Sequence, residues 1–75
     1  MNATYYDWVV ERLRKDGKPK ARREFVTDVS PIVWGGFRYA ARHTKAHARD
    51  QARDLNRKGI VAVVRKVEIT ERVIE

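Results

Sequence analysis

One segment of the sequence has a clear helical pattern, and it constrains the fold more than any other feature. Thr44 is a favourable N-cap residue, and Gly59 is a favourable residue just beyond a helix C-terminus. Between them, apolar residues at i, i+4 and i+7 form one narrow stripe: Ala48, Ala52 and Leu55. The pattern predicts a single helix at about residues 45–58, and its small side chains favour close packing on a sheet.

A valine-rich run follows the helix and predicts a strand at about residues 60–74. Residues 60–64 are all apolar, and Val67, Ile69 and Val73 then recur at a period of two. This pattern is typical of a strand that is buried first on both faces and later on one. Because a chain of 75 residues has a small core, we expect Val67, Ile69 and Val73 to form an oligomer interface in a homodimer.

The N-terminal part favours a hairpin at about residues 4–30. Residues 5–14 are rich in aromatic and β-branched side chains, although a helix competes there, because Thr4 and Asp7 can form a capping box. Asp16-Gly17 is a hairpin turn signal, and residues 23–29 form the candidate return strand.

The least regular segment, residues 31–43, contains Trp34-Gly35-Gly36. Two adjacent glycines indicate a turn that needs a positive φ or a close approach of the backbone. A phosphate-binding loop is the alternative, but the Lys-Ser or Lys-Thr pair of that motif does not follow. Together the segments predict one α+β domain over residues 1–75: a small antiparallel sheet of three or more strands with one helix packed on it, in the order ββαβ.

Positive charge is concentrated in two parts of the chain. The sequence has 17 Lys and Arg against 10 Asp and Glu, for a net charge of +7. Residues 12–23 hold seven cations against one acid, and residues 38–58 hold seven against two. Charge concentrated in this way attracts polyanions; the alternative is a solvated surface that serves solubility alone.

The candidate binding residues come from the hairpin and from one side of the helix. Arginines spaced by four on a helix repel one another, so helix stability alone does not favour them. A basic hairpin tip can follow a phosphate backbone. We expect contacts with nucleic acid or a nucleoprotein complex, or with an acidic protein surface, from Arg12, Arg14, Lys15, Lys18, Lys20, Arg22, Arg23, Arg49, Arg53 and Arg57.

The residues that catalysis or metal binding would need are missing or scattered. There is no cysteine, which excludes disulfide scaffolds and thiolate metal sites. His43 and His47 are one helical turn apart, but Thr44 as N-cap places His43 outside the helix, so we expect no metal site. Thr27 and Ser30 belong to no nucleophile motif. We expect a non-enzymatic protein without a cofactor.

No apolar run approaches the roughly 20 residues of a membrane span, and the N-terminus does not read as a signal peptide. These features predict a cytoplasmic protein without a membrane partner. We expect Trp8, Phe25, Trp34 and Phe37 in the core of so small a domain, and we expect exposed rings at Tyr5, Tyr6 and Tyr39.

The run from Trp34 to Val64 resembles part of small phage- and prophage-encoded proteins of ββαβ type. The resemblance rests on Thr44 opening an alanine-rich helix, on Gly59 before a valine-rich strand, and on the upstream turn at Asp16-Gly17. It implies an accessory protein that binds or inhibits host machinery in the host cytoplasm, anti-CRISPR-type inhibitors among them. No functional residue carries over from it.

Overall fold

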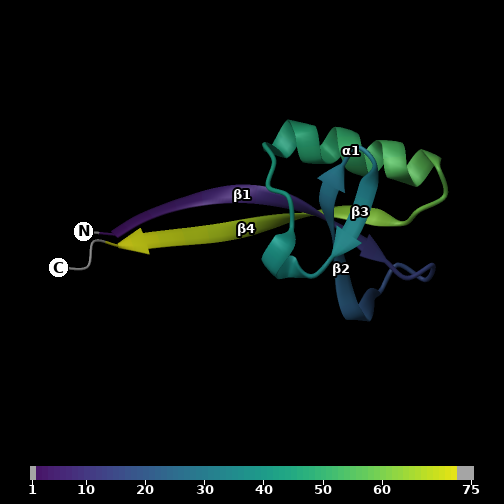
Figure 1. Ribbon diagram of the computed structural model, residues 1–75, viewed down its shortest axis with the longest axis horizontal. Helices are drawn as coiled ribbons and strands as arrows, with labels where there is room; N and C mark the ends of the chain where they lie inside the picture. Colours follow the sequence, from purple (N-terminus) through teal and green to yellow (C-terminus); the bar gives the residue numbers. More distant parts are fainter. Residues whose placement is uncertain (1, 73–75) are drawn as a thin grey trace.

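Four strands form one antiparallel sheet, and a single α-helix packs on it (Figure 1). The computed structural model describes residues 2–72, and the strand order across the sheet is β3-β2-β1-β4. In chain order the elements are β1 (Asn2–Leu13), β2 (Pro19–Val29), β3 (Ile32–Gly35), the 3₁₀ turn η1 (Phe37–Tyr39), α1 (Lys45–Arg57) and β4 (Ala62–Arg72). The expected α+β class is confirmed. The ββαβ order is not, because a third strand precedes the helix.

β1 and β4 form the most extensive pairing of the sheet. It runs without a register shift from Asn2 opposite Arg72 to Arg12 opposite Ala62. β2 pairs with β1 only near residues 11–13, so the rest of this pairing continues past the body of the sheet. Figure 1 shows it as a two-stranded ribbon that projects to one side, in a molecule measuring 48 × 26 × 20 Å. We call residues 2–7 and 67–72 the arm.

The chain between η1 and α1 covers β1 where β2 no longer pairs with it. The Trp8 N–H donates to the His43 carbonyl at 3.1 Å, and the His43 N–H donates to the Trp8 carbonyl at 2.8 Å. The Ala41 N–H donates to the Val26 carbonyl at 2.8 Å. Toward the N-terminus of β1, in the arm, β1 continues to pair with β4.

The tip of the first hairpin lies at Asp16-Gly17, the pair that signals a turn in the sequence. Gly17 has a φ of +82°, which favours glycine. The Arg14 N–H donates to the Lys18 carbonyl at 2.9 Å, and the Lys18 N–H donates to Asp16 Oδ1 at 3.0 Å. These bonds hold a short, exposed loop between β1 and β2.

β3 lies in the segment for which the sequence predicts a turn. The register of β2 and β3 shifts between Val26 and Asp28, and the hydroxyl of the bulged Thr27 donates to the Val33 carbonyl at 3.1 Å. A Cβ on Gly35 would lie 2.8 Å from Thr27 Cγ2, whereas a Cβ on Gly36 would meet nothing within 4 Å. Of the two expected reasons for glycine here, the close approach applies, and it applies to Gly35.

We expect Gly35→Ala to lower the free energy of unfolding by about 1–3 kcal/mol, because the added Cβ overlaps Thr27 Cγ2. Gly36→Ala is the matched control and is expected to change it by less than about 1 kcal/mol. Urea denaturation measures both. Equal losses from the two substitutions would contradict the role of the close approach.

α1 packs on the sheet through the stripe that the sequence indicates. The Thr44 hydroxyl accepts a hydrogen bond from the His47 N–H at 3.3 Å, and Gly59 has a φ of +86° beyond the last turn. The buried cluster between helix and sheet consists of Val10, Val26, Ala48, Ala52, Leu55 and Ala62.

The large aromatic side chains divide between the core and the surface. Phe25 is buried, and Trp8 and Trp34 pack partly buried against the core cluster. The prediction that Phe37 is a core residue is wrong: its side chain is 53% exposed and meets Phe25 edge-on, with centroids 5.3 Å apart. The predicted exposed rings are confirmed at Tyr5, Tyr6 and Tyr39.

Candidate functional site

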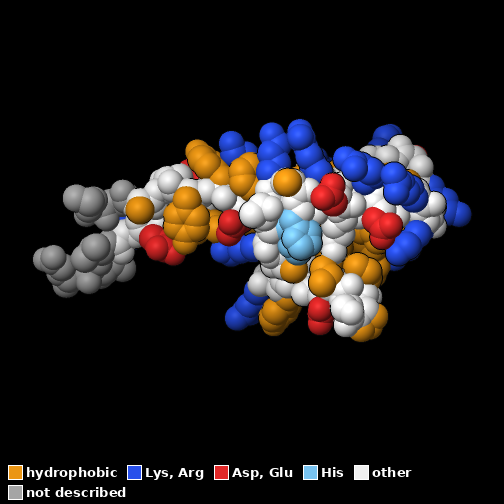
Figure 2. All heavy atoms as spheres, turned by 90° about the horizontal axis from the view of Figure 1, so that it is seen from above, with side chains coloured by type: hydrophobic (Ala, Val, Ile, Leu, Met, Phe, Trp, Pro, Cys, Tyr) orange, Lys and Arg blue, Asp and Glu red, His pale blue; other side chains and the backbone are white. Residues whose placement is uncertain are grey.

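One side of α1 carries a row of arginines beside the edge strand β4. Arg49, Arg53 and Arg57 are spaced by four, and the same spacing includes Lys45, which the sequence analysis did not select. A groove of about 700 Å³ lies along β4, lined by Arg49, Ala52, Arg53, Asn56, Arg57, Ala62, Val63 and Val64. Figure 2, seen from the helix side, shows Lys and Arg side chains along one margin and around the end away from the arm.

The hairpin tip and the C-terminal end of α1 lie at the same end of the molecule (Figure 1). The Ala62 N–H donates to Asn56 Oδ1 at 3.0 Å, and Asn56 Nδ2 donates to the Ala62 carbonyl at 3.3 Å. Ala62 in turn pairs with Arg12, and the Leu13 N–H donates to the Val61 carbonyl at 2.8 Å. These contacts tie the last helical turn to the base of the tip. We define the basic end as Arg14, Lys15, Lys18, Arg57 and Lys58.

Three of the predicted hairpin cations are engaged by other side chains. The Arg12 guanidinium lies over the Trp34 ring, 5.4 Å from its centroid. The Lys20 Nζ pairs with Glu24 at 2.9 Å. Arg23 donates to a buried carboxylate of β1. These three side chains stabilise the fold and have less freedom to follow a ligand.

The other predicted cations remain at the surface. Arg14 pairs with Asp16 at 3.2 Å and Arg53 with Asp50 at 3.6 Å, and all four side chains are exposed. Such surface pairs contribute at most about 1 kcal/mol and open easily. Within residues 2–72, no ion pair engages Lys15, Lys18, Arg22, Arg49 or Arg57.

A buried carboxylate joins three strands on the sheet face opposite α1. Glu11 is 0% exposed and alternates along β1 with Val10, which belongs to the cluster under the helix. Arg23 of β2 donates from Nε at 2.9 Å and from Nη2 at 2.6 Å, and Arg65 of β4 donates from Nε at 3.0 Å. The Arg23 hydrogen bonds are the main cause that lowers the pKa of Glu11, against its burial, which raises it. Arg23 is therefore part of a structural ion pair.

The arm differs from the basic end in its chemistry. The Tyr5 hydroxyl donates to Glu71 at 2.6 Å, and this bond raises the pKa of Tyr5. At the base of the arm, Lys66 Nζ lies 4.1 Å from the centroid of the Tyr6 ring. The arm thus carries exposed aromatic rings and charges of both signs, whereas the basic end carries cations.

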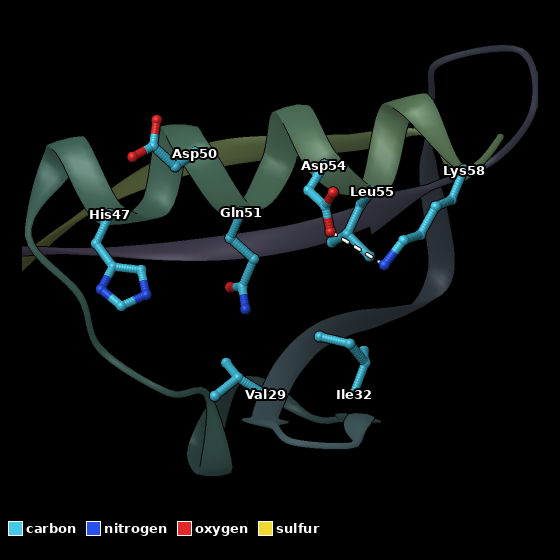
Figure 3. A pocket seen from close by; sticks show the side chains of 8 residues that line it. All are labelled: Val29, Ile32, His47, Asp50, Gln51, Asp54, Leu55 and Lys58. Carbon is cyan, nitrogen blue, oxygen red and sulfur yellow. Dashed lines mark ion pairs between the residues drawn. The ribbon is translucent and has the colours of Figure 1, made fainter.

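A second hollow, of about 550 Å³, lies between α1 and the ends of β2 and β3 (Figure 3). Its lining residues are Val29, Ile32, His47, Asp50, Gln51, Asp54, Leu55 and Lys58. The positive charge of Lys58 is balanced in this hollow, because its Nζ pairs with Asp54 at 3.0 Å. The His47 ring stacks on His43 at 4.8 Å, and burial, with His47 nearby, lowers the pKa of His43. No metal-binding group of three or more side chains gathers among the described residues.

Two of the three residues predicted for an oligomer interface lie on the outer strand of the sheet. Val67 and Ile69 are half-buried in β4, opposite Asp7 and Tyr5 of β1. Val73 lies outside the described residues. β4 is therefore the strand to consider for contact with another chain.

Comparisons with protein families, with curated proteins and with solved structures give no match. No described helix has the length and apolar character needed to cross a membrane.

Proposed function

We propose that the protein is a non-enzymatic nucleic-acid-binding protein whose basic end, with the arginine row of α1, holds a phosphate backbone. The observation that supports this function is that the tip of the first basic segment and the C-terminal end of the second lie at one end of the molecule. They are far apart in the sequence, and the Asn56–Ala62 and Arg12–Ala62 contacts bring them together. A nucleic acid, alone or in a nucleoprotein complex, presents phosphates at a repeat that such a surface can follow.

The exposed groups suit phosphates better than bases. Guanidinium groups bind phosphate oxygens in a bidentate manner, and three of them are spaced along one side of α1. Phosphate contacts position a protein without reading the base sequence. We therefore expect binding with little sequence preference.

Salt dependence tests the proposal. If four or five phosphates are contacted, the slope of log K against log salt is about −4, because each contact releases about 0.9 counterion. Between 50 and 200 mM salt, the affinity for a labelled DNA or RNA duplex should fall by roughly 10²–10³-fold. Fluorescence anisotropy measures this. Absence of binding at the lower salt would contradict the function and would favour an acidic protein surface as the target.

Charge reversal locates the surface. The two double variants Arg14→Glu with Lys18→Glu, and Arg53→Glu with Arg57→Glu, should each abolish most of the binding. The control Arg38→Glu with Arg42→Glu lowers the net charge of +7 by the same four units but lies outside the basic end. Retained affinity in the control, with circular dichroism unchanged in all three, supports the assignment; an equal loss in the control would refute it.

A further inference from the structure

β4 is one edge of the sheet, and half of its backbone groups point outward. The bond from the Leu13 N–H to the Val61 carbonyl fixes the alternation of the ladder, so odd-numbered residues of β4 bond to β1. The pair of Trp8 and Lys66 fits this alternation. The N–H and carbonyl of Trp8 bond to His43 on the side of β1 away from β4, so they do not bond to Lys66. The outward-facing residues are Ala62, Val64, Lys66, Glu68, Thr70 and Arg72.

At the start of β4, a side chain of the helix occupies the edge. The Asn56 side chain bonds both the N–H and the carbonyl of Ala62, as a neighbouring strand would. The available edge therefore starts at Val64. A strand edge of this length is a template on which another strand can pair.

We propose that β4 pairs antiparallel with β4 of a second copy of this chain, about a two-fold axis at Val67. In this register Val64 lies opposite Thr70 of the second copy, and Lys66 lies opposite its Glu68; symmetry repeats each contact. The pairing ends at Thr70, because the next outward residue, Arg72, would meet Ala62, whose backbone groups Asn56 already bonds. The edge from Val64 to Thr70 is centred on Val67.

Charge selects the same axis independently. An axis at Lys66 would place two lysines opposite each other, and an axis at Glu68 would place two glutamates opposite each other; both arrangements are destabilising. A shift by one residue would set outward groups against inward ones. Of these arrangements, only the axis at Val67 satisfies the backbone and pairs opposite charges.

The same pairing supports the arm. A two-stranded ribbon alone is marginally stable in water. In the dimer the arm of each copy lies beside β4 of the other, in a four-stranded sheet with Val67 packed against Val67. The basic ends then lie at opposite ends of the dimer, and Val64, where the pairing begins, also lines the groove beside the arginine row of α1.

A charge exchange tests the register. By sedimentation equilibrium at high micromolar concentration, we expect the wild type to be a dimer. Lys66→Glu should raise the dissociation constant at least about tenfold, because the new carboxylate of each copy lies opposite Glu68 of the other copy. Adding Glu68→Lys should restore the wild-type value. A monomeric wild type, or a dissociation constant that Lys66→Glu leaves unchanged, would overturn the proposal.

A single cysteine tests the axis without changing charge. The chain has no cysteine, and a residue on the axis forms a non-hydrogen-bonded pair with a Cα separation of about 4.5 Å, within disulfide range. Val67→Cys should form a covalent dimer on mild oxidation, and the controls Lys66→Cys and Glu68→Cys should not. Cross-linking in a control but not in Val67→Cys would overturn the axis. Both tests measure only the association of two copies of the chain, so their results do not depend on nucleic-acid binding.

Discussion

Glu11→Ala is expected to lower the free energy of unfolding by about 2–4 kcal/mol, because it removes the shared partner of Arg23 and Arg65 from a buried position. The range lies below that of a fully buried triad, since the two arginine side chains are 53% and 43% exposed and water screens them. Against a stability of about 5–15 kcal/mol for a typical domain, the loss is large. Chemical denaturation measures it. Glu24→Ala, which removes a more exposed ion-pair partner, should cost less than about 1 kcal/mol; equal costs would contradict the structural role of Glu11.

The same residue predicts a pH dependence. Because the pKa of Glu11 is lowered in the folded protein, its charge contributes stability above the ordinary pKa near 4.5, and this contribution is lost as the pH falls toward the folded pKa. The stability difference between the wild type and Glu11→Gln should therefore shrink in acid. Denaturation at several values between about pH 3 and pH 7 measures it. A difference that stays constant down to the lowest pH would contradict the lowered pKa.

Leu55→Ala is expected to cost about 2–5 kcal/mol, a loss comparable with that of Glu11→Ala. Leu55 is 2% exposed and is the largest side chain that α1 buries against the sheet. Its truncation leaves a cavity in a small core, where few neighbours can move to fill it. Thermal unfolding followed by circular dichroism measures the loss. Val33→Ala, at a side chain that is 45% exposed, is the control and should cost less than about 1 kcal/mol.

The helix was predictable because its signals are local. Thr44, the apolar stripe and Gly59 all lie within one stretch of chain, and each acts on the backbone near it. β3 was not predictable in this way. Its glycine is needed because Gly35 lies against Thr27, eight residues earlier in the chain, and the sequence analysis could name that reason but not the neighbour.

The candidate site was predictable in composition but not in arrangement. The sequence shows where the cations are, but only the structure shows that Arg23 lies against Glu11, twelve residues away, and that Arg65 joins it from β4. A signal for this centre was present: Glu11 stands between Val9 and Leu13 on one face of β1, where an unpaired carboxylate would be costly. The end of α1 is held beside the base of the hairpin tip by Asn56, which bonds the backbone of Ala62. No periodicity or motif in the sequence indicates these side-chain bonds.

The opposite edge of the sheet, β3, is only four residues long. Two copies joined through β4 would present β3 at both outer margins of the combined sheet. A further copy could pair with the sheet only at β3, and a strand this short offers little template for it. In the proposed dimer, growth would therefore stop at two copies, and a rise in protein concentration would change the fraction of paired molecules and not the size of the assembly.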